Sequence, residues 1–219
     1  MFVLSKYRFC YSQGDEVKFI SHLDFLRTVV RIFRRANLPV KYSEGFNPHM
    51  VMTIGLPLSV GTTTVCDCLE AEFTEDIDTS SALQKINEVC PRGVVFTGIK
   101  KAEGLTPLHL ISSALYTASF TTDKAVDLAH YIDAPCVMTE KKSNRKVNEV
   151  NIKDFIKSIT AQSSDGFNHT LTMHINAGNT SNLKPELVVK SIADFYGADI
   201  SDINIERKEI YFDDMTRVF

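Results

Sequence analysis

Hydrophobic and polar positions divide the first hundred residues into alternating strands and helices. Residues 6–12 place Tyr7, Phe9 and Tyr11 at every second position, which is the period of a strand. Residues 21–37 instead carry apolar side chains three and four apart, which predicts a helix. The core-facing stripe predicted for this helix is Leu23, Leu26, Val30 and Phe33. Further strands are predicted at residues 51–58, 66–73 and 94–101, with a helix that starts after Asp78 and ends near Pro91. The order is β-α-β-β-α-β.

The second half has a similar pattern. Strands are predicted at residues 116–121, 136–141, 147–150, 169–175 and 203–212, and helices at residues 124–132, 152–159 and 185–196. Pro185 in the first turn and Gly197 after the last turn mark the ends of the third helix. We therefore expect an α+β protein built from two tandem ferredoxin-like units of the βαββαβ type, each with an antiparallel sheet. The predicted units are residues 1–104 and 115–219.

The first predicted helix carries basic side chains on one face. Ser21 is a suitable N-cap, and Asp24 three residues later completes a start that resembles a capping box. Arg27, Arg31 and Arg34 follow at four- and three-residue spacing, so they share a face away from the predicted stripe. This row is either a site for an anion or a solvated helix face with local ion pairs.

A short loop follows the helix. Residues 43–49 contain Gly45, Asn47-Pro48 and a final His49, which predicts a structured turn that presents the histidine. Phe46 either stacks on a base or fills a partner's pocket, or else it plugs its own loop. The candidate binding residues of this helix and loop are Arg27, Arg31, Arg34, Phe46, Asn47 and His49.

This stretch contains several unusual short sequence motifs. SHLD at residue 21, YSEGFNPH at residue 42 and GLPLSVG at residue 55 occur in this order, and the chain resembles the radical SAM-linked protein family. The resemblance implies an accessory role beside a separate radical S-adenosylmethionine protein, which would be a partner. The chain departs from the family where Asn151 replaces an aspartate, and where Met50 and Val51 replace a proline and a lysine.

Composition and charge exclude several classes of protein. The net charge is −3, but residues 1–60 carry eight Lys and Arg against four Asp and Glu, which makes this lobe positive. The five cysteines are scattered without a CxxC pair, so we expect reduced thiols, no iron–sulfur cluster and no metal site. Nucleotide-binding glycine loops and HExxH are missing from the sequence, and we expect no cofactor. No long apolar segment points to a membrane, so the expected location is the cytoplasm.

Two histidines are weak catalytic candidates. His22 lies in the first turn of the predicted helix and His49 ends the loop, and in a shared pocket they would suit proton transfer to a phosphodiester. A second basic cluster, Lys141, Lys142, Arg145 and Lys146, is predicted at a hairpin turn, where it would contact a phosphate backbone or serve solubility.

Three functions remain open from the sequence. The favoured hypothesis is a non-catalytic accessory module that binds an anionic substrate, most simply RNA, and presents it to a separate radical S-adenosylmethionine enzyme. The first alternative is an adaptor that docks this enzyme without RNA. The second is a metal-independent endoribonuclease that uses His49. Whether the chain is an enzyme is left open, and the pattern favours that it is not.

Overall fold

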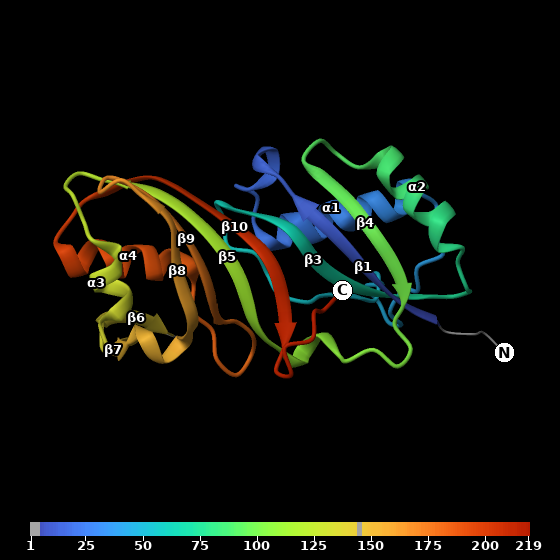
Figure 1. Cartoon of the computed structure of the whole chain (residues 1–219). Helices are drawn as coiled ribbons and strands as arrows, with labels where there is room; N and C mark the ends of the chain where they lie inside the picture. Colours follow the sequence, from blue (N-terminus) through green and yellow to red (C-terminus); the bar gives the residue numbers. More distant parts are fainter. Residues whose placement is uncertain (1–4, 144–145) are drawn as a thin grey trace. The chain divides into compact units, whose positions relative to one another are not determined.

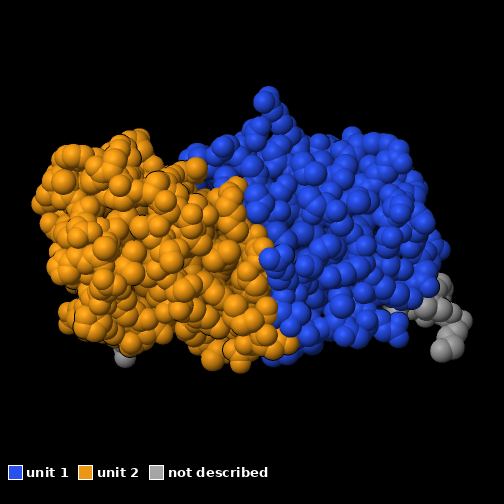
Figure 2. Space-filling model, viewed as in Figure 1, with its two compact units in different colours: residues 1–111, 216–219 blue, residues 112–215 orange. Residues whose placement is uncertain are grey.

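The structure is a computed structural model that describes residues 5–143 and 146–219, with the side chains of residues 141–147 left out (Figure 1). The chain forms two compact units. Unit 1 contains residues 1–111 and 216–219, and unit 2 contains residues 112–215 (Figure 2). The last four residues therefore belong with the first half of the chain.

Unit 1 has the predicted element order. It consists of β1 (Ser5–Gln13), η1 (Asp15–Val17), α1 (His22–Arg35), β2 (Met52–Ile54), β3 (Thr62–Phe73), α2 (Thr79–Val89), β4 (Val94–Lys101) and η2 (Leu108–Leu110). Strand β1 lies between β4 and β3, β2 pairs with the other edge of β3, and these three pairings are antiparallel. Both helices pack on one face of this sheet, where they form a single core with the alternate residues Tyr7, Phe9 and Tyr11 of β1.

The core-facing stripe of α1 differs from the prediction. Phe25, Val29, Ile32 and Phe33 are buried, whereas Leu23 is 62% exposed and Leu26 and Val30 are half-buried. Both sets satisfy helical spacing, so the sequence alone does not set the rotation of the helix. Phe33 is common to both sets, and packing selects the set that adds Phe25, whose ring centroid lies 5.1 Å from that of Tyr11 on β1.

Unit 2 contains an additional hairpin. Its elements are β5 (Ile111–Thr122), α3 (Leu128–Asp133), β6 (Met138–Ser143), β7 (Lys146–Asn151), η3 (Ile152–Phe155), β8 (Ile156–Ser164), β9 (Asn168–Asn176), α4 (Pro185–Tyr196) and β10 (Ile200–Phe212). The strand order is β10-β5-β9-β8, and β6 and β7 form a separate two-stranded sheet. The β5–β9 and β8–β9 pairings are antiparallel. Among the described residues there are four α-helices, so the architecture is mixed α+β with mainly antiparallel sheets.

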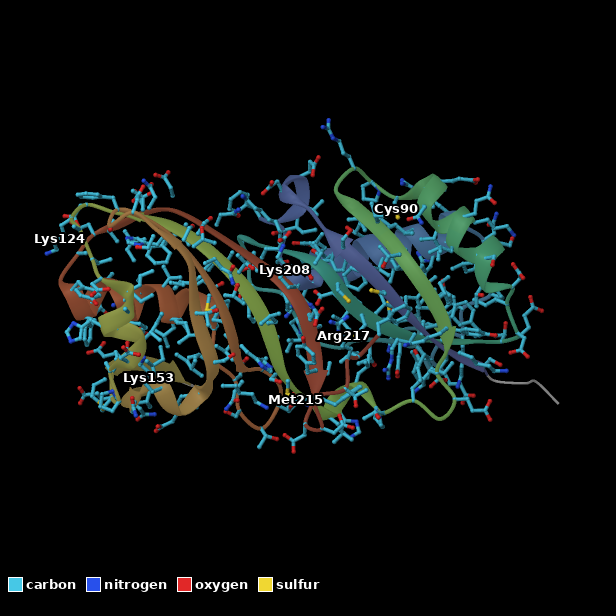
Figure 3. All side chains as sticks on the ribbon, in the orientation of Figure 1. Cys90, Lys124, Lys153, Lys208, Met215 and Arg217 are labelled. Atoms are coloured by element: carbon cyan, nitrogen blue, oxygen red, sulfur yellow. The ribbon has the colours of Figure 1, made fainter. Side chains whose placement is uncertain are left out.

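The helix predicted at residues 152–159 is wrong. Residues 152–155 form one 3-10 turn, capped by the Asn151 side chain, and the chain then continues as β8. The three- to four-residue spacing of the isoleucines fits a helix, but pairing with β9 satisfies the backbone of this segment as a strand. Lys153, labelled in Figure 3, donates to the carbonyls of Tyr131 and Ile132 at the end of α3. The turn thus caps α3 before the strand begins.

No helix in the described part of the chain has the length and apolar character needed to cross a bilayer.

Candidate functional site

The start of α1 is held by the predicted cap. Ser21 Oγ accepts a hydrogen bond from the Asp24 backbone N at 3.2 Å and lies 2.7 Å from Asp24 Oδ2. At this second distance the Ser21 hydroxyl donates to the carboxylate, and this hydrogen bond, followed by that from Arg27, lowers the pKa of the Asp24 carboxyl. A charged carboxylate in the first turn also complements the helix dipole. The local sequence therefore determines where α1 begins.

The outer face of α1 carries three arginines. Arg27, Arg31 and Arg34 are all exposed, and at 3.6 residues per turn they fall within an arc of about 60° opposite the buried stripe. We call these three residues the arginine ridge. Consecutive members are separated by about 6 Å and about 4.5 Å of helix rise. The arginine ridge is exposed, as the sequence predicted.

Members of the arginine ridge differ in their neighbours. Arg27 Nη1 lies 2.8 Å from Asp24 Oδ1, an exposed pair that holds the side chain only weakly. Arg34 Nε donates to Tyr42 Oη at 3.0 Å, and its guanidinium lies over the Tyr42 ring at 5.8 Å. Within residues 5–143 and 146–219, no hydrogen-bond or ion-pair partner of Arg31 is found. The middle of the arginine ridge is therefore open to a ligand.

Loop 43–49 lies beside the C-terminal end of the arginine ridge. An isolated antiparallel bridge between Tyr42 and Met50 closes its base, and the Ser43 N–H donates to the His49 carbonyl at 2.8 Å. The His49 N–H donates to Ser43 Oγ at 3.1 Å, and His49 Nδ1 lies 2.9 Å from the same oxygen. This is a structured turn, as the Gly and Asn-Pro signals predict.

Phe46 occupies the tip of loop 43–49. Its exposed fraction is 112%, and a side-chain atom added at the neighbouring Gly45 would meet nothing within 4 Å. Phe46 is therefore not the plug of its own loop. Asn47 is exposed beside it, and its carbonyl oxygen lies 3.4 Å from His49 Nδ1. An exposed ring that packs on no core is available for contact with a ligand.

The two candidate histidines do not share a pocket. His22 is half-buried at the first position of α1, in a small cavity lined also by Tyr11 and Gln13. His49 ends the loop that follows Tyr42, and Tyr42 contacts Arg34 near the C-terminal end of α1. Arg34 lies twelve residues beyond His22, which is about 18 Å of helix rise. The histidines therefore belong to opposite ends of α1, which removes the geometry that joint proton transfer would need.

The second predicted basic cluster lies partly outside the residues that the structure describes. The hairpin exists: β6 and β7 pair in register from Met138–Asn151 to Ser143–Lys146. Lys141 and Lys142 lie on β6, and Lys146 begins β7, but their side chains are outside the described part, and Arg145 lies outside the described residues altogether. The contribution of this cluster remains a prediction.

No group of three or more His, Cys, Asp or Glu side chains capable of holding a metal ion is found in the part of the chain that the structure describes.

Sequence reasoning missed a polar cavity of 370 Å³ in unit 2. Its lining comes from the β8–β9 hairpin and the end of β5, with Ser119, Thr121, Ser164, Asp165 and His169 among the residues. Thr122 Oγ1 lies 3.2 Å from the Phe167 carbonyl oxygen and 3.0 Å from His169 Nε2, and Ser164 Oγ lies 2.9 Å from His169 Nδ1. The signal in the sequence was the density of Ser and Thr on strands that end together. With its hydroxyls and carboxylates, this cavity offers little to a polyanion.

Solved structures of low similarity match most of the chain. One is a crystal structure of a Cbf5–Nop10–Gar1 complex, with 12% identity and a TM-score of 0.48, covering 92% of this chain and 49% of that one. Another is an H/ACA RNP bound to a substrate RNA containing 2′-deoxyuridine, with 13% identity and a TM-score of 0.47, covering 91% and 46%. A third is an unknown protein from Galdieria sulphuraria, with 10% identity and a TM-score of 0.29, covering 93% and 98%. This chain spans about half the length of the first two.

The amino-acid sequence matches a family model but none of the curated proteins. No curated protein matches the chain. A family model described as "Uncharacterized protein conserved in bacteria (DUF2344)" matches residues 6–185, which run from the second residue of β1 in unit 1 to the first residue of α4 in unit 2. The chain therefore belongs to this family.

Proposed function

We propose that unit 1 is a non-catalytic module that binds single-stranded RNA across the arginine ridge and loop 43–49. The observation that carries this proposal is that three exposed arginines stand opposite the core of α1, beside a fully exposed phenylalanine. RNA-binding surfaces combine cations for the phosphates with aromatic rings on which bases stack. Both parts occur here on adjacent elements.

The chemistry of arginine favours phosphate as the ligand. A guanidinium presents several N–H donors in a planar fork and binds phosphate oxygens in pairs. Tyr42 uses only Nε of Arg34, so the hydrogen bond orients the side chain and leaves its two terminal nitrogens for a ligand. Arg31, between its neighbours, needs no ion pair to be broken before it binds.

Phe46 supplies the second contact. A ring at the tip of a loop can stack on an unpaired base, which rewards single strands over duplexes. Its neighbour Asn47 carries amide donors and an acceptor that suit a base edge. The pair would add limited base preference to binding that the arginine ridge provides in a sequence-independent way.

The proposal also includes a partner enzyme and a ferredoxin-like fold for both units. The resemblance to the radical SAM-linked family supports a separate radical S-adenosylmethionine enzyme, in the cytoplasm, as the recipient of the bound RNA. We also infer that both units are ferredoxin-like. Support comes from the strand orders β4-β1-β3-β2 and β10-β5-β9-β8, each of which is the 4-1-3-2 arrangement of a βαββαβ unit once the β6–β7 hairpin is set aside as an insertion.

Two alternatives make different demands on the same surface. A protein-only adaptor would use the exposed Leu23 and Phe46 as apolar anchors, and its binding would depend little on salt. An endoribonuclease that uses His49 would need a second proton-transfer group nearby, and His22 is too far along α1 to serve. Salt dependence and RNA cleavage therefore separate the three functions.

The decisive experiment measures the affinity of the full chain for a fluorescein-labelled, mixed-sequence single-stranded RNA by fluorescence anisotropy. Arg27→Glu combined with Arg31→Glu should weaken binding at least about tenfold, because two phosphate contacts become repulsive. Arg92→Glu is the matched control, since Arg92 is an exposed arginine of the same unit that pairs with Glu16. Equal affinity of the double variant and the control would overturn the proposal.

A salt titration tests the mechanism of binding. For single strands, the slope of log K against log salt concentration is about −0.7 per phosphate neutralised. Arg31→Gln should therefore make the slope shallower by about 0.7. An unchanged slope would remove Arg31 from the phosphate contacts.

A further inference from the structure

The face of the unit 1 sheet that points away from the helices carries a group of thiols. Along β1, Tyr7, Phe9 and Tyr11 enter the helical core, so Cys10 points to the opposite face. Cys10 pairs in register with Cys68 on β3 and with Gly98 on β4. Its exposed fraction is 4%.

Cys66 lies on the same face, two residues before Cys68. The β1–β3 register shifts between Tyr11 and Gln13, and this irregularity lies directly beside Cys66. The Sγ atoms of Cys10 and Cys66 are 3.4 Å apart, and all five cysteines of the chain are reduced. A disulfide requires a sulfur–sulfur distance of about 2.0 Å, so the two sulfurs need to approach by about 1.4 Å.

The surroundings of the pair favour a reactive thiolate. A hydrogen bond from Cys66 lowers the pKa of the Cys10 thiol to about 7, against the opposing effects of burial and of Asp67. A hydrogen bond from Thr97 and the charge of Lys100 lower it further. The same pairing raises the pKa of Cys66, which keeps its proton. One thiolate beside one thiol is the arrangement in which the first sulfur is oxidised and the second resolves it.

We propose that Cys10 and Cys66 form a peroxide-sensitive dithiol that closes to an intrachain disulfide between β1 and β3. The Cys10 thiolate attacks one oxygen of hydrogen peroxide, the O–O bond breaks, and Cys10 becomes a sulfenic acid while the released hydroxide takes up a proton as water. The Cys66 sulfur then displaces the hydroxyl from Cys10 as a second water. Two thiols and one hydrogen peroxide thus become one disulfide and two waters. This site is independent of RNA binding on α1.

The half-buried position of Cys66 provides the route for a small oxidant. Cys66 is more exposed than Cys10, and peroxide is little larger than water. On the β4 side of Cys10 the surface is closed, because Phe219 packs against Gly98, where an added Cβ would come within 2.7 Å of the ring. Lys100 Nζ lies over the same ring, 4.2 Å from its centroid. A bulky alkylating reagent should therefore reach Cys10 poorly in the folded protein.

The other cysteines serve as internal references. Cys136 is exposed and lies in unit 2. Cys90, labelled in Figure 3, lies at the end of α2, and burial raises its thiol pKa to about 11. Cys68 is almost fully buried, and its Sγ would lie 2.8 Å from a Cβ added at Gly55. Among the described residues, no thiol lies as close to Cys90 or to Cys136 as Cys66 lies to Cys10.

The test uses the full, reduced chain treated with hydrogen peroxide, followed by denaturation, alkylation, trypsin digestion and mass spectrometry. Cys10 falls in the tryptic peptide 9–18, whereas Cys66 and Cys68 fall in peptide 42–85. We expect these peptides joined, with the loss of two hydrogens, and we expect Cys68, Cys90 and Cys136 to be alkylated. Reduction with dithiothreitol should separate the peptides again.

Two variants assign the bond. Cys66→Ser should abolish the joined peptide, and Cys136→Ser should leave its yield unchanged. Cys10 recovered fully alkylated in the wild type, or still joined to peptide 42–85 in Cys66→Ser, would overturn the proposal. Conversion of Cys10 to sulfinic acid without the joined peptide would do the same.

Discussion

Unit 1 uses arginine in two regions with opposite surroundings. Arg8 of β1 is 1% exposed, and its guanidinium donates to Glu70 Oε1 from Nε at 3.0 Å and from Nη2 at 2.6 Å. The same side chain donates to the carbonyls of Thr106 and Val218. The arginine ridge on α1 instead faces solvent. An arginine therefore stabilises the fold where its guanidinium is buried among hydrogen-bond partners, and it is available to a ligand where the guanidinium faces solvent.

The energetic consequences of the two settings differ. Removal of one member of a buried ion pair leaves the other charge without compensation in a poorly solvated place, whereas an exposed pair contributes at most about 1 kcal/mol. Arg8 also joins three distant segments of unit 1, since Glu70, Thr106 and Val218 belong to β3, to the loop between β4 and η2, and to the returning residues 216–219. We therefore expect mutations to separate the two regions clearly.

The largest effect on stability is expected from Arg8→Met. Glu70 would lose two hydrogen bonds and keep only the longer pair with Lys6 at 3.7 Å, and two carbonyls would lose a donor. The free energy of unfolding should therefore fall by about 3–5 kcal/mol. Arg31→Met is the matched control and should change it by less than about 0.5 kcal/mol. Urea unfolding followed by circular dichroism measures both. Similar losses in the two variants would show that burial does not distinguish these arginines.

The next largest effect concerns the ligand. Phe46→Ala should weaken RNA binding by about 1–3 kcal/mol, because one stacked base would be lost, and should leave the unfolding midpoint unchanged. Phe167→Ala, a partly exposed phenylalanine of unit 2, is the control. Anisotropy titrations at one salt concentration compare the two. Equal affinities would assign Phe46 to another partner, such as a protein.

A smaller effect is expected at the start of α1. Ser21→Ala removes the side-chain acceptor of the Asp24 N–H and should cost about 1 kcal/mol of stability, whereas Ser21→Thr should retain most of it. The arginine ridge depends on the rotation of α1, which packing determines, so RNA affinity should change little. A large loss of affinity in Ser21→Ala would indicate that the cap itself contacts the ligand.

The smallest effect is a pH dependence in unit 2, where buried polar groups again have partners. Burial lowers the pKa of His169 and of His174 below 6.5. The unfolded chain takes up these protons more readily than the folded one, so stability is retained above pH 6.5 and lost as the pH falls through the lowered values. His169→Gln should reduce this slope in urea unfolding. An unchanged slope would assign it to other groups.

The local sequence determined the elements whose signals lie within a few residues. Ser21 and Asp24 set the beginning of α1, Pro185 and Gly197 enclosed α4, and Gly45 with Asn47-Pro48 predicted a structured loop. The exposure of the arginine ridge was also predicted, because three charges on one helix face rarely enter a core. These features depend on backbone preferences and on the cost of burying charge, both of which act locally.

Tertiary structure decided the rest through contacts between distant residues. The rotation of α1 followed from ring packing against β1, and residues 156–164 became a strand because β9 offered its backbone. The burial of Arg8 and the approach of Cys10 to Cys66 required segments 56 to 210 residues apart to meet. Sequence spacing carries no information on such meetings, because they arise from the register between strands rather than from any local preference.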